Sequence, residues 1–437
     1  MLAHGYKLLT FLLLLIGINI VYAIDEVENT ESDGARLAII DTDYNIATYD
    51  LTSETLTQLT DDGANDRRYQ WATWSTDGRL AYFCCEATGA LPTSQIFVSS
   101  NGVTTPELLY ETEGEFIIYA SWSPADCGTD CREVAILANN LRNGTLAVDI
   151  IEDSTESTVT RLGTGSPFYF HWNATGSDLI FHRNNSQLDI HTRAQNDISA
   201  SLSDSSGTFQ TPVWSPIDSR VLVGVRGAER GTTDLVIIDG DDTTTLVSGL
   251  EGLVSFLWSP DGSKIAYRTV DQFGINNIIV VDANTGEEIS ASDVSGAVAF
   301  FWSPDSTRIA FITIEGTTQG QNATLPPIAP ETPFMQRFVQ DDSPTALYWN
   351  VLDVETGANV RYSPFIPTFE MTYLLTYFDQ FAPSHRVWSP DSNYLVYTGF
   401  VDRDSQPEPF VYIQDVSDNS IAPQSITEGV FSVWSFE

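Results

Sequence analysis

The chain has 437 residues, of which 59 are acidic and 20 basic, so its formal net charge is −39 at neutral pH. Nucleic acids and anionic membrane surfaces are poor partners for such a chain, because approach is repelled and no counterions are released. The length admits one large domain or two ordinary ones, and β assemblies commonly exceed the ordinary size.

The first 23 residues have the form of a secretory signal peptide. Lys7 precedes a run of apolar residues, and Ala23 ends a neutral stretch before an acidic one. We therefore predict export to the periplasm or the extracellular space, with 24–35 as a flexible acidic segment and no membrane insertion of the mature chain. A retained N-terminal anchor is the alternative, although Asn19 and the shortness of the run argue against a span.

A repeat that begins with tryptophan recurs along the rest of the chain. Its fullest form is WSPDGSKIAY at Trp258, in which a tight turn joins the aromatic residue to an alternating apolar strand. Pro260 presets the turn and Gly262 accepts left-handed backbone, whereas Ser306 and Ser392 replace this glycine in two copies and should cost strain. The structural repeat residues are Trp74, Trp122, Trp172, Trp214, Trp258, Trp302, Trp388 and Trp434.

The spacing of these tryptophans predicts an all-β propeller. Successive separations are 48, 50, 42, 44, 44, 86 and 46, and a period of 40 to 50 residues suits a four-stranded blade. Residues 36–60 supply three strands without a tryptophan strand, and the final segment FSVWSFE supplies one. We predict that residues 36–437 form a single propeller, most simply of eight blades, with seven or nine blades as alternatives. The C-terminal strand should join the N-terminal blade and so close the ring. Closure removes exposed edges, so we expect a monomer.

These segments resemble the WD40-like PD40 repeats of the TolB-type β-propeller family, whose mark is W-S-P-D-G followed by a short I-A-F/Y strand. The resemblance covers essentially all of the chain after the signal peptide and implies a propeller. The chain departs from TolB itself in lacking the N-terminal α/β domain and in having more blades. It also lacks the Trp-Asp pair that closes each blade of a eukaryotic WD40 protein.

The interval between Trp302 and Trp388 is about 40 residues longer than one blade. Insertions at about 313–345 and 364–385 account for the excess, and the alternation of strand direction places both on one face. Long connections often carry function, so we predict that this face binds a partner. Packing of the two insertions as a hydrophobic cap, or an extra blade, are the alternatives. The candidate partner-binding residues are Phe334, Arg337, Phe338, Tyr373, Tyr377 and Phe378.

Four cysteines and two histidines are candidates for further sites. Cys127 and Cys131 bracket a short turn and are predicted to form a disulfide, since exported proteins meet an oxidising compartment. A second bond, between the adjacent Cys84 and Cys85, is possible but strained. His171 and His385 could both face the central channel and hold a metal with acidic partners. No cofactor is identified from the sequence, and Ca²⁺ or another divalent cation stays open.

The sequence favours a binding protein over an enzyme. It contains no G-x-S-x-G nucleophile elbow, P-loop or H-E-x-x-H motif. We predict an exported binding or scaffold propeller that recognises a protein or a glycan through the face that carries the insertions. The alternative is a carbohydrate-active enzyme, a lyase or a glycoside hydrolase, with a metal or carboxylates in the central channel. That alternative requires histidines or carboxylates to converge on one cavity.

Overall fold

Short apolar segments bounded by turn residues form antiparallel strands in the computed structural model. It describes residues 34–86, 91–102, 105–166, 168–184, 187–195, 197–201, 211–271, 274–314, 346–402 and 405–437. The predicted signal peptide and most of the predicted acidic segment lie outside these residues. Within the described ranges, no helix is long and apolar enough to cross a membrane.

The first repeats each fold into a sheet of four strands that follow one another in the chain. These sheets consist of β4 (Arg67–Trp74), β5 (Leu80–Glu86), β6 (Thr93–Ser99) and β7 (Glu107–Glu113); β8 (Glu115–Gly128), β9 (Cys131–Asn140), β10 (Thr145–Asp153) and β11 (Val159–Gly165); β12 (Phe168–Trp172), β13 (Asp178–Arg183), β14 (Gln187–Thr192) and β15 (Asp197–Ser201); and β16 (Val213–Trp214), β17 (Val221–Arg226), β18 (Thr232–Asp239) and β19 (Asp242–Glu251).

Two larger sheets and one sheet that joins the chain ends complete the described strands. The five-stranded sheet has β20 (Leu253–Trp258), β21 (Lys264–Asp271), β22 (Gly274–Ile275), β23 (Ile279–Asp282) and β24 (Glu288–Ala291). The seven-stranded sheet has β25 (Ala299–Trp302), β26 (Arg308–Ile314), β27 (Leu347–Asp353), β28 (Asn359–Pro367), β29 (Tyr394–Phe400), β30 (Phe410–Asp415) and β31 (Gln424–Glu428). The last sheet has β1 (Arg36–Ile40), β2 (Ile46–Asp50), β3 (Thr55–Gln58) and β32 (Phe431–Trp434).

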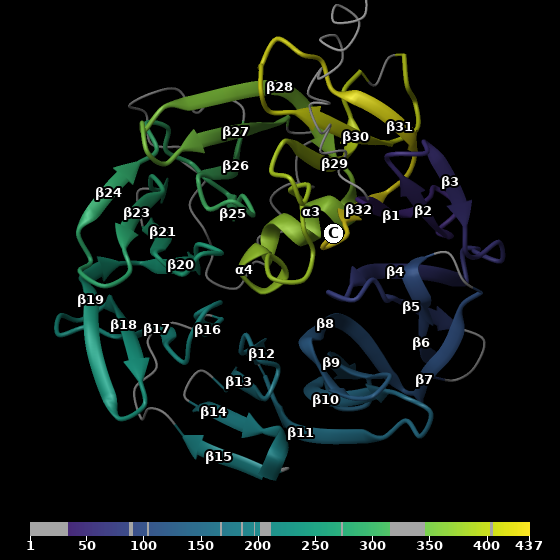
Figure 1. The fold of residues 1–437 in the computed structure, drawn as a ribbon, viewed down its shortest axis with the longest axis horizontal. Helices are drawn as coiled ribbons and strands as arrows, with labels where there is room; N and C mark the ends of the chain where they lie inside the picture. Colours follow the sequence, from purple (N-terminus) through teal and green to yellow (C-terminus); the bar gives the residue numbers. More distant parts are fainter. Residues whose placement is uncertain are drawn as a thin grey trace, which may run out of the picture. The chain divides into compact units, whose positions relative to one another are not determined.

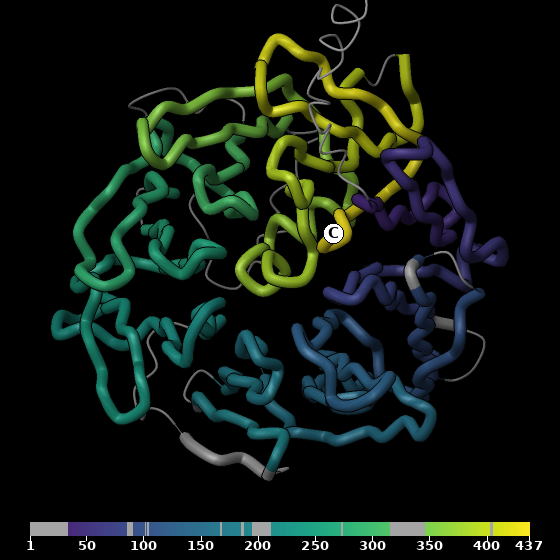
Figure 2. Tube along the Cα trace, viewed as in Figure 1, coloured from purple at the N-terminus to yellow at the C-terminus, as the bar shows by residue number. Residues whose placement is uncertain are grey.

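The sheets of Gly34–Glu437 stand in a ring, with β4, β20 and β32 near its centre and β3, β19 and β24 at its rim (Figure 1). The chain runs once round the ring, so that its last strands come to lie beside its first (Figure 2). There β32 pairs with β1, with Leu37 opposite Trp434 and Ile40 opposite Phe431. The predicted propeller and its closure by the C-terminal strand are therefore confirmed.

The seven-stranded sheet contains the strands of two repeats. The end of β28 pairs with β29, with Pro367 opposite Gly399, where the inner strand of the last repeat would begin. The chain then leaves the sheet, forms helices α3 (Phe369–Thr376) and α4 (Phe378–Phe381), and returns at Trp388, which bridges to Leu395. The second insertion thus interrupts an inner strand. The number of blades stays a prediction, because one continuous sheet spans two repeats.

The repeat tryptophans pack between neighbouring sheets, and all eight are buried. Five of their indole N–H groups donate to the carbonyl of the residue that precedes the tryptophan of an earlier repeat. These bonds run from Trp122 to Thr73 (3.1 Å), Trp172 to Ser121 (3.1 Å), Trp258 to Val213 (3.2 Å), Trp302 to Leu257 (3.4 Å) and Trp388 to Phe301 (3.0 Å). Each indole therefore supplies both apolar area and a polar link between sheets.

Candidate functional site

The second insertion lies inside the ring, near its centre. Figure 1 shows α3 and α4 near the ring centre, surrounded by the inner strands. The hydroxyl of Thr368 caps α3 by accepting a hydrogen bond from the N–H of Met371 at 3.2 Å. We call residues 368–385 the plug. Its apolar side chains Met371, Leu374, Leu375, Phe378 and Phe381 are buried.

Hydrogen bonds join the plug to several sheets. The amide of Gln380 donates to the carbonyl of Phe170 at 2.9 Å and accepts from its N–H at 3.2 Å. The hydroxyls of Tyr119 and Ser384 share a bond of 3.0 Å, and Thr73 donates to the carbonyl of Ser384 at 3.2 Å. Because these partners come from β12, β8 and β4, the plug braces three sheets from within.

Aromatic packing continues this bracing. The ring of Phe381 lies 5.4 Å from that of Trp71 and 5.0 Å from that of Tyr119. Phe378 is 1% exposed, and its ring lies 4.9 Å from that of Phe300. The prediction that Phe378 binds a partner is therefore wrong, because the ring wall already covers this side chain.

The remaining predicted partner-binding residues differ in position. Tyr373 and Tyr377 are half-buried and stack on each other at 4.9 Å, and Tyr373 also packs on Trp71. They keep only part of their surface for a partner, and their role stays a prediction. Phe334, Arg337 and Phe338 lie outside the described residues, as does all of the first insertion between 315 and 345.

The points where the two insertions leave the sheet are adjacent. Ile314 pairs with Leu347, and Leu347 pairs with Phe365, so three neighbouring strands end together at one face. Phe369 follows on this face and is 61% exposed. We call the surface around Phe369 and these three strand ends the insertion face.

Two opposite charges, Arg268 of β21 and Asp379 of α4, interact electrostatically between the plug and the wall. The guanidinium of Arg268 donates to the carbonyl of Val298 at 3.0 Å and stands 5.2 Å from the ring centre of Phe378. Burial raises the pKa of Asp379 to about 6, although the charge of Arg268 opposes this shift. Burial likewise lowers the pKa of Arg268 to about 10. These groups were not predicted, since nothing local in the sequence pairs β21 with α4.

A cavity of about 390 Å³ occupies the opposite end of the channel, where the turns after the repeat tryptophans lie. We call it the turn-end cavity. The plug contributes Ala382, Pro383 and Ser384 to its wall, and Arg386 and Phe436 stand beside them. Seven repeat tryptophans also line it, namely Trp74, Trp122, Trp172, Trp214, Trp258, Trp302 and Trp388. Ala174 and Pro260 belong to the lining and are exposed, so the cavity reaches the surface.

The two predicted metal ligands are placed differently. His171 lines the turn-end cavity, and its Nδ1 accepts a hydrogen bond from the N–H of Trp214 at 3.3 Å. His385 is fully buried against Phe381, and its Nδ1 bonds the hydroxyl of Ser384 at 2.7 Å. Burial lowers the pKa of His171 to about 4 and that of His385 to about 3. Across the described ranges, no three His, Cys, Asp or Glu side chains gather as a metal-binding group, and a metal site at these histidines stays a prediction.

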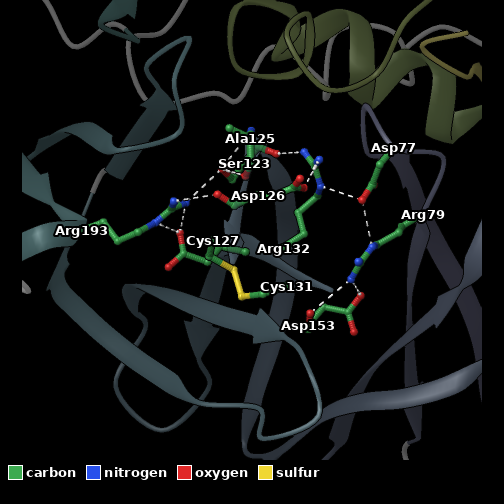
Figure 3. Close-up of a disulfide and its surroundings, with 11 residues drawn as sticks. Asp77, Arg79, Ser123, Ala125, Asp126, Cys127, Cys131, Arg132, Asp153 and Arg193 are labelled. Atoms are coloured by element: carbon green, nitrogen blue, oxygen red, sulfur yellow. Dashed lines mark hydrogen bonds and ion pairs between the residues drawn. A yellow bond between two sulfur atoms is a disulfide. The ribbon is translucent and has the colours of Figure 1, made fainter. Parts of the chain in front are cut away.

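The predicted disulfide joins Cys127 to Cys131, whose Cα atoms are 5.2 Å apart. Figure 3 shows it in the turn between β8 and β9, beside Arg132. The guanidinium of Arg132 forms ion pairs with Asp77 (3.0 Å) and Asp126 (2.5 Å). The turn is thereby tied to the neighbouring sheet. Cys84 is buried in β5, and the side chain of Cys85 lies outside the described part of the structure.

No family model and no curated protein matches the chain. Among solved structures, that of a eukaryotic initiation factor is 12% identical over 92% of this chain and 98% of that one, with a TM-score of 0.50. An oligogalacturonate lyase in complex with manganese is 14% identical over 87% of this chain and 96% of that one, also with a TM-score of 0.50.

The matching solved structures also include TolB from Acinetobacter baumannii, with 16% identity over 58% of this chain and 62% of that one and a TM-score of 0.34. The two matches with a TM-score of 0.50 show a shared fold, and at such low identity they carry no activity from one protein to another. The chain is a β-propeller, as its resemblance to TolB-type repeats implied.

Proposed function

We propose that this chain is an exported β-propeller that binds a protein or glycan partner through its insertion face. The observation that carries the proposal is that both insertions leave the sheet at adjacent strand ends, near an exposed Phe369. At 61%, Phe369 is the most exposed large apolar side chain among the described residues. Exposed aromatic residues on a fixed support are typical anchors of binding surfaces.

The residue before Phe369 is held firmly. Thr368 is buried, and its hydroxyl lies 2.6 Å from the carbonyl of Val430, to which it donates, and 3.2 Å from the hydroxyl of Thr398. The plug behind it is braced by three sheets. Phe369 therefore needs little ordering when a partner binds, which lowers the entropic cost of association.

The test compares capture of the partner from the native envelope or medium by four versions of the full chain. They are the wild type, a deletion of 316–343, Phe369→Ser, and a control, Leu108→Ser. Leu108 is 52% exposed on the outer strand β7, so this control removes similar apolar surface elsewhere. We expect the deletion and Phe369→Ser each to weaken capture at least tenfold and the control to leave it unchanged. Enzymatic removal of glycans from the captured partner separates a glycan from a protein epitope.

Equal capture by the wild type and by both insertion-face variants would overturn the proposal. The second candidate, a carbohydrate-active enzyme, draws support from the shared fold of the oligogalacturonate lyase that binds manganese. It requires several histidines or carboxylates around one cavity. In the described chain, the turn-end cavity receives His171, while His385 is enclosed by the plug. No observation on these residues favours the enzyme, and the binding function is the one proposed.

A further inference from the structure

The turn-end cavity differs in charge from the rest of the protein. The chain carries 59 acidic residues, yet the described residues that line the cavity include no Asp or Glu. Arg386 is the one Lys or Arg among them. The rest of the lining consists mainly of tryptophan indoles, proline rings and serine hydroxyls. Such a wall suits a ligand with an apolar body and one negative group.

The backbone of Arg386 is held by a hydrogen bond, whereas its guanidinium has no polar partner among the described residues. Its carbonyl accepts a hydrogen bond from the N–H of Trp434 at 2.9 Å, at the point where the ring closes. Its guanidinium lies 4.0 Å from the ring centre of Phe436. Among the described residues, no side chain or carbonyl forms an ion pair or hydrogen bond with this guanidinium. Burial lowers the pKa of Arg386 to about 10, and the group stays charged at neutral pH.

Other arginines near the turns have acidic or carbonyl partners, which Arg386 lacks among the described residues. Arg308 approaches Asp305 and donates to the carbonyl of Ser392, while Arg220 pairs with Asp218 at 2.9 Å. A partly buried cation without such a partner is costly, because it loses hydration and gains no opposite charge. A carboxylate that entered the cavity would supply that partner, and the planar guanidinium can donate to both of its oxygens.

His171, the histidine that lines the cavity, does not supply a second positive charge for a carboxylate. Because the N–H of Trp214 donates to Nδ1 of His171, the neutral ring carries its proton on Nε2. With its pKa lowered to about 4 by burial, His171 brings no charge at neutral pH. The cavity thus presents one fixed positive charge in an otherwise neutral wall.

We propose that the turn-end cavity binds an organic carboxylate, whose charge pairs with Arg386 and whose apolar body lies against the tryptophan and proline rings. The volume of about 390 Å³ falls within the usual range of small-ligand sites. The site lies at the opposite end of the channel from the insertion face, so it stands independently of the proposed function. The carboxylate could belong to a free acid or to the C-terminus of a polypeptide.

The first experiment measures calorimetrically how the full chain binds two matched probe pairs. One pair is phenylacetate and phenylacetamide. The other is a short acetylated peptide ending in phenylalanine, with a free or an amidated C-terminus. We expect at least one acid to bind tenfold or more tightly than its amide. A preference in the peptide pair alone assigns the site to a polypeptide terminus, and a preference for phenylacetate assigns it to free acids. Equal binding within both pairs would overturn the proposal.

Variants of Arg386 test the charge itself. Arg386→Gln keeps much of the length without the charge, and it should abolish the preference for the acid over the amide. Arg386→Lys should retain part of that preference, which separates a lost charge from a disturbed fold. Phe369→Ser, at the other face, should bind the acid like the wild type. An undiminished preference in Arg386→Gln contradicts the proposal.

Two neighbouring turn positions test the location. Ala174 is exposed and lines the cavity, whereas Thr175 is exposed and does not line it. Ala174→Phe should fill the cavity and weaken acid binding at least tenfold, while Thr175→Phe should change it less than twofold. Thermal unfolding of both variants checks that the fold is kept. Unchanged binding in Ala174→Phe would show that the ligand does not use this cavity.

Discussion

The side-chain amide of Gln380 pairs with both backbone groups of Phe170, a residue 210 positions earlier in the chain. Phe170 lies in β12, the first strand of its sheet, which has no further strand beside it in the described sheet order. The side-chain amide therefore satisfies the backbone N–H and carbonyl of Phe170, which a neighbouring strand would otherwise pair at this inner edge of the sheet. This pair links the plug directly to the ring.

Removing this pair should destabilise the protein. Gln380→Ala leaves the N–H and carbonyl of Phe170 without partners in a buried place, and we expect the free energy of unfolding to fall by about 2 to 4 kcal/mol. Gln424→Ala, at an exposed position of β31, is the control and should cost less than about 0.5 kcal/mol. Chemical denaturation monitored by tryptophan fluorescence gives both values. Similar stability of the two variants would mean that the Gln380 amide does not hold the plug in place.

The serines that replace glycine in two turns have a compensating bond. Ser306 has φ 62° and Ser392 has φ 64°, which confirms the strained conformation expected from the repeat. The hydroxyl of Ser306 accepts a hydrogen bond from the N–H of Asp261 at 3.0 Å, and that of Ser392 accepts from Asp305 at 3.1 Å. Each serine thus ties its turn to that of the preceding repeat.

This arrangement predicts an unusual order of stability at position 306. Ser306→Ala keeps the strained backbone and loses the bond, so it should lower the free energy of unfolding by about 1 to 2 kcal/mol. Ser306→Gly loses the bond but relieves the strain, so its cost should be about 1 kcal/mol smaller. Urea titrations of the three proteins test the order. If alanine is tolerated better than glycine, the strain is not what the hydroxyl offsets.

At Gly262 a side chain is excluded by a neighbour as well as by the backbone. Its φ is 67°, and an added Cβ would stand 2.5 Å from Cγ1 of Ile217, a side chain that is 59% exposed. Gly262→Ala should cost about 2 to 3 kcal/mol in the wild type. In an Ile217→Ala background the same change should cost only the backbone strain, about 1 kcal/mol. A double-mutant cycle measures the coupling, and its absence would show that Ile217 does not restrict this turn.

The carboxyl of Asp379 in the plug should make the free energy of unfolding depend on pH. Burial raises the pKa of Asp379 from its ordinary value of 3.8 to about 6, against the opposing charge of Arg268. The folded state therefore binds this proton more tightly than the unfolded state, so the stabilisation is complete below about pH 4 and is lost as pH rises through 6. Relative to the wild type, Asp379→Asn should gain about 1 to 3 kcal/mol between pH 4 and 7.

A matched variant controls this pH experiment. Burial raises the pKa of Asp261, but hydrogen bonds from Ser259 and Ser263 outweigh it and lower the value to about 2. Its stabilising effect is present above about pH 4 and is lost as pH falls through 2, so Asp261→Asn should show no change in its difference from the wild type between pH 5 and 7. Unfolding free energies at several pH values give both profiles. A flat profile for Asp379→Asn would contradict the assigned pKa.

Much of the fold could be predicted because each repeat is specified by residues close together in the sequence. Turn residues such as Pro260 and Gly262 act within four positions, and the strand that follows alternates visibly. The short interval between Cys127 and Cys131 likewise limits their geometry. The insertion helices could not be placed in this way. Phe378 and Tyr373 are alike as aromatic residues, yet one is buried against Phe300 and the other is partly exposed.

The sequence by itself determined the repeating unit, the turns and the closure of the ring, because periodic apolar residues and left-handed turn positions act over short distances. Only the tertiary structure decided that the second insertion packs inside the ring and that Arg386 lines a cavity whose described lining has no acidic residue. Both outcomes depend on which sheets meet around the channel axis. Burial and pairing of this kind arise between residues hundreds of positions apart, as in Gln380 and Phe170, and no local pattern encodes them.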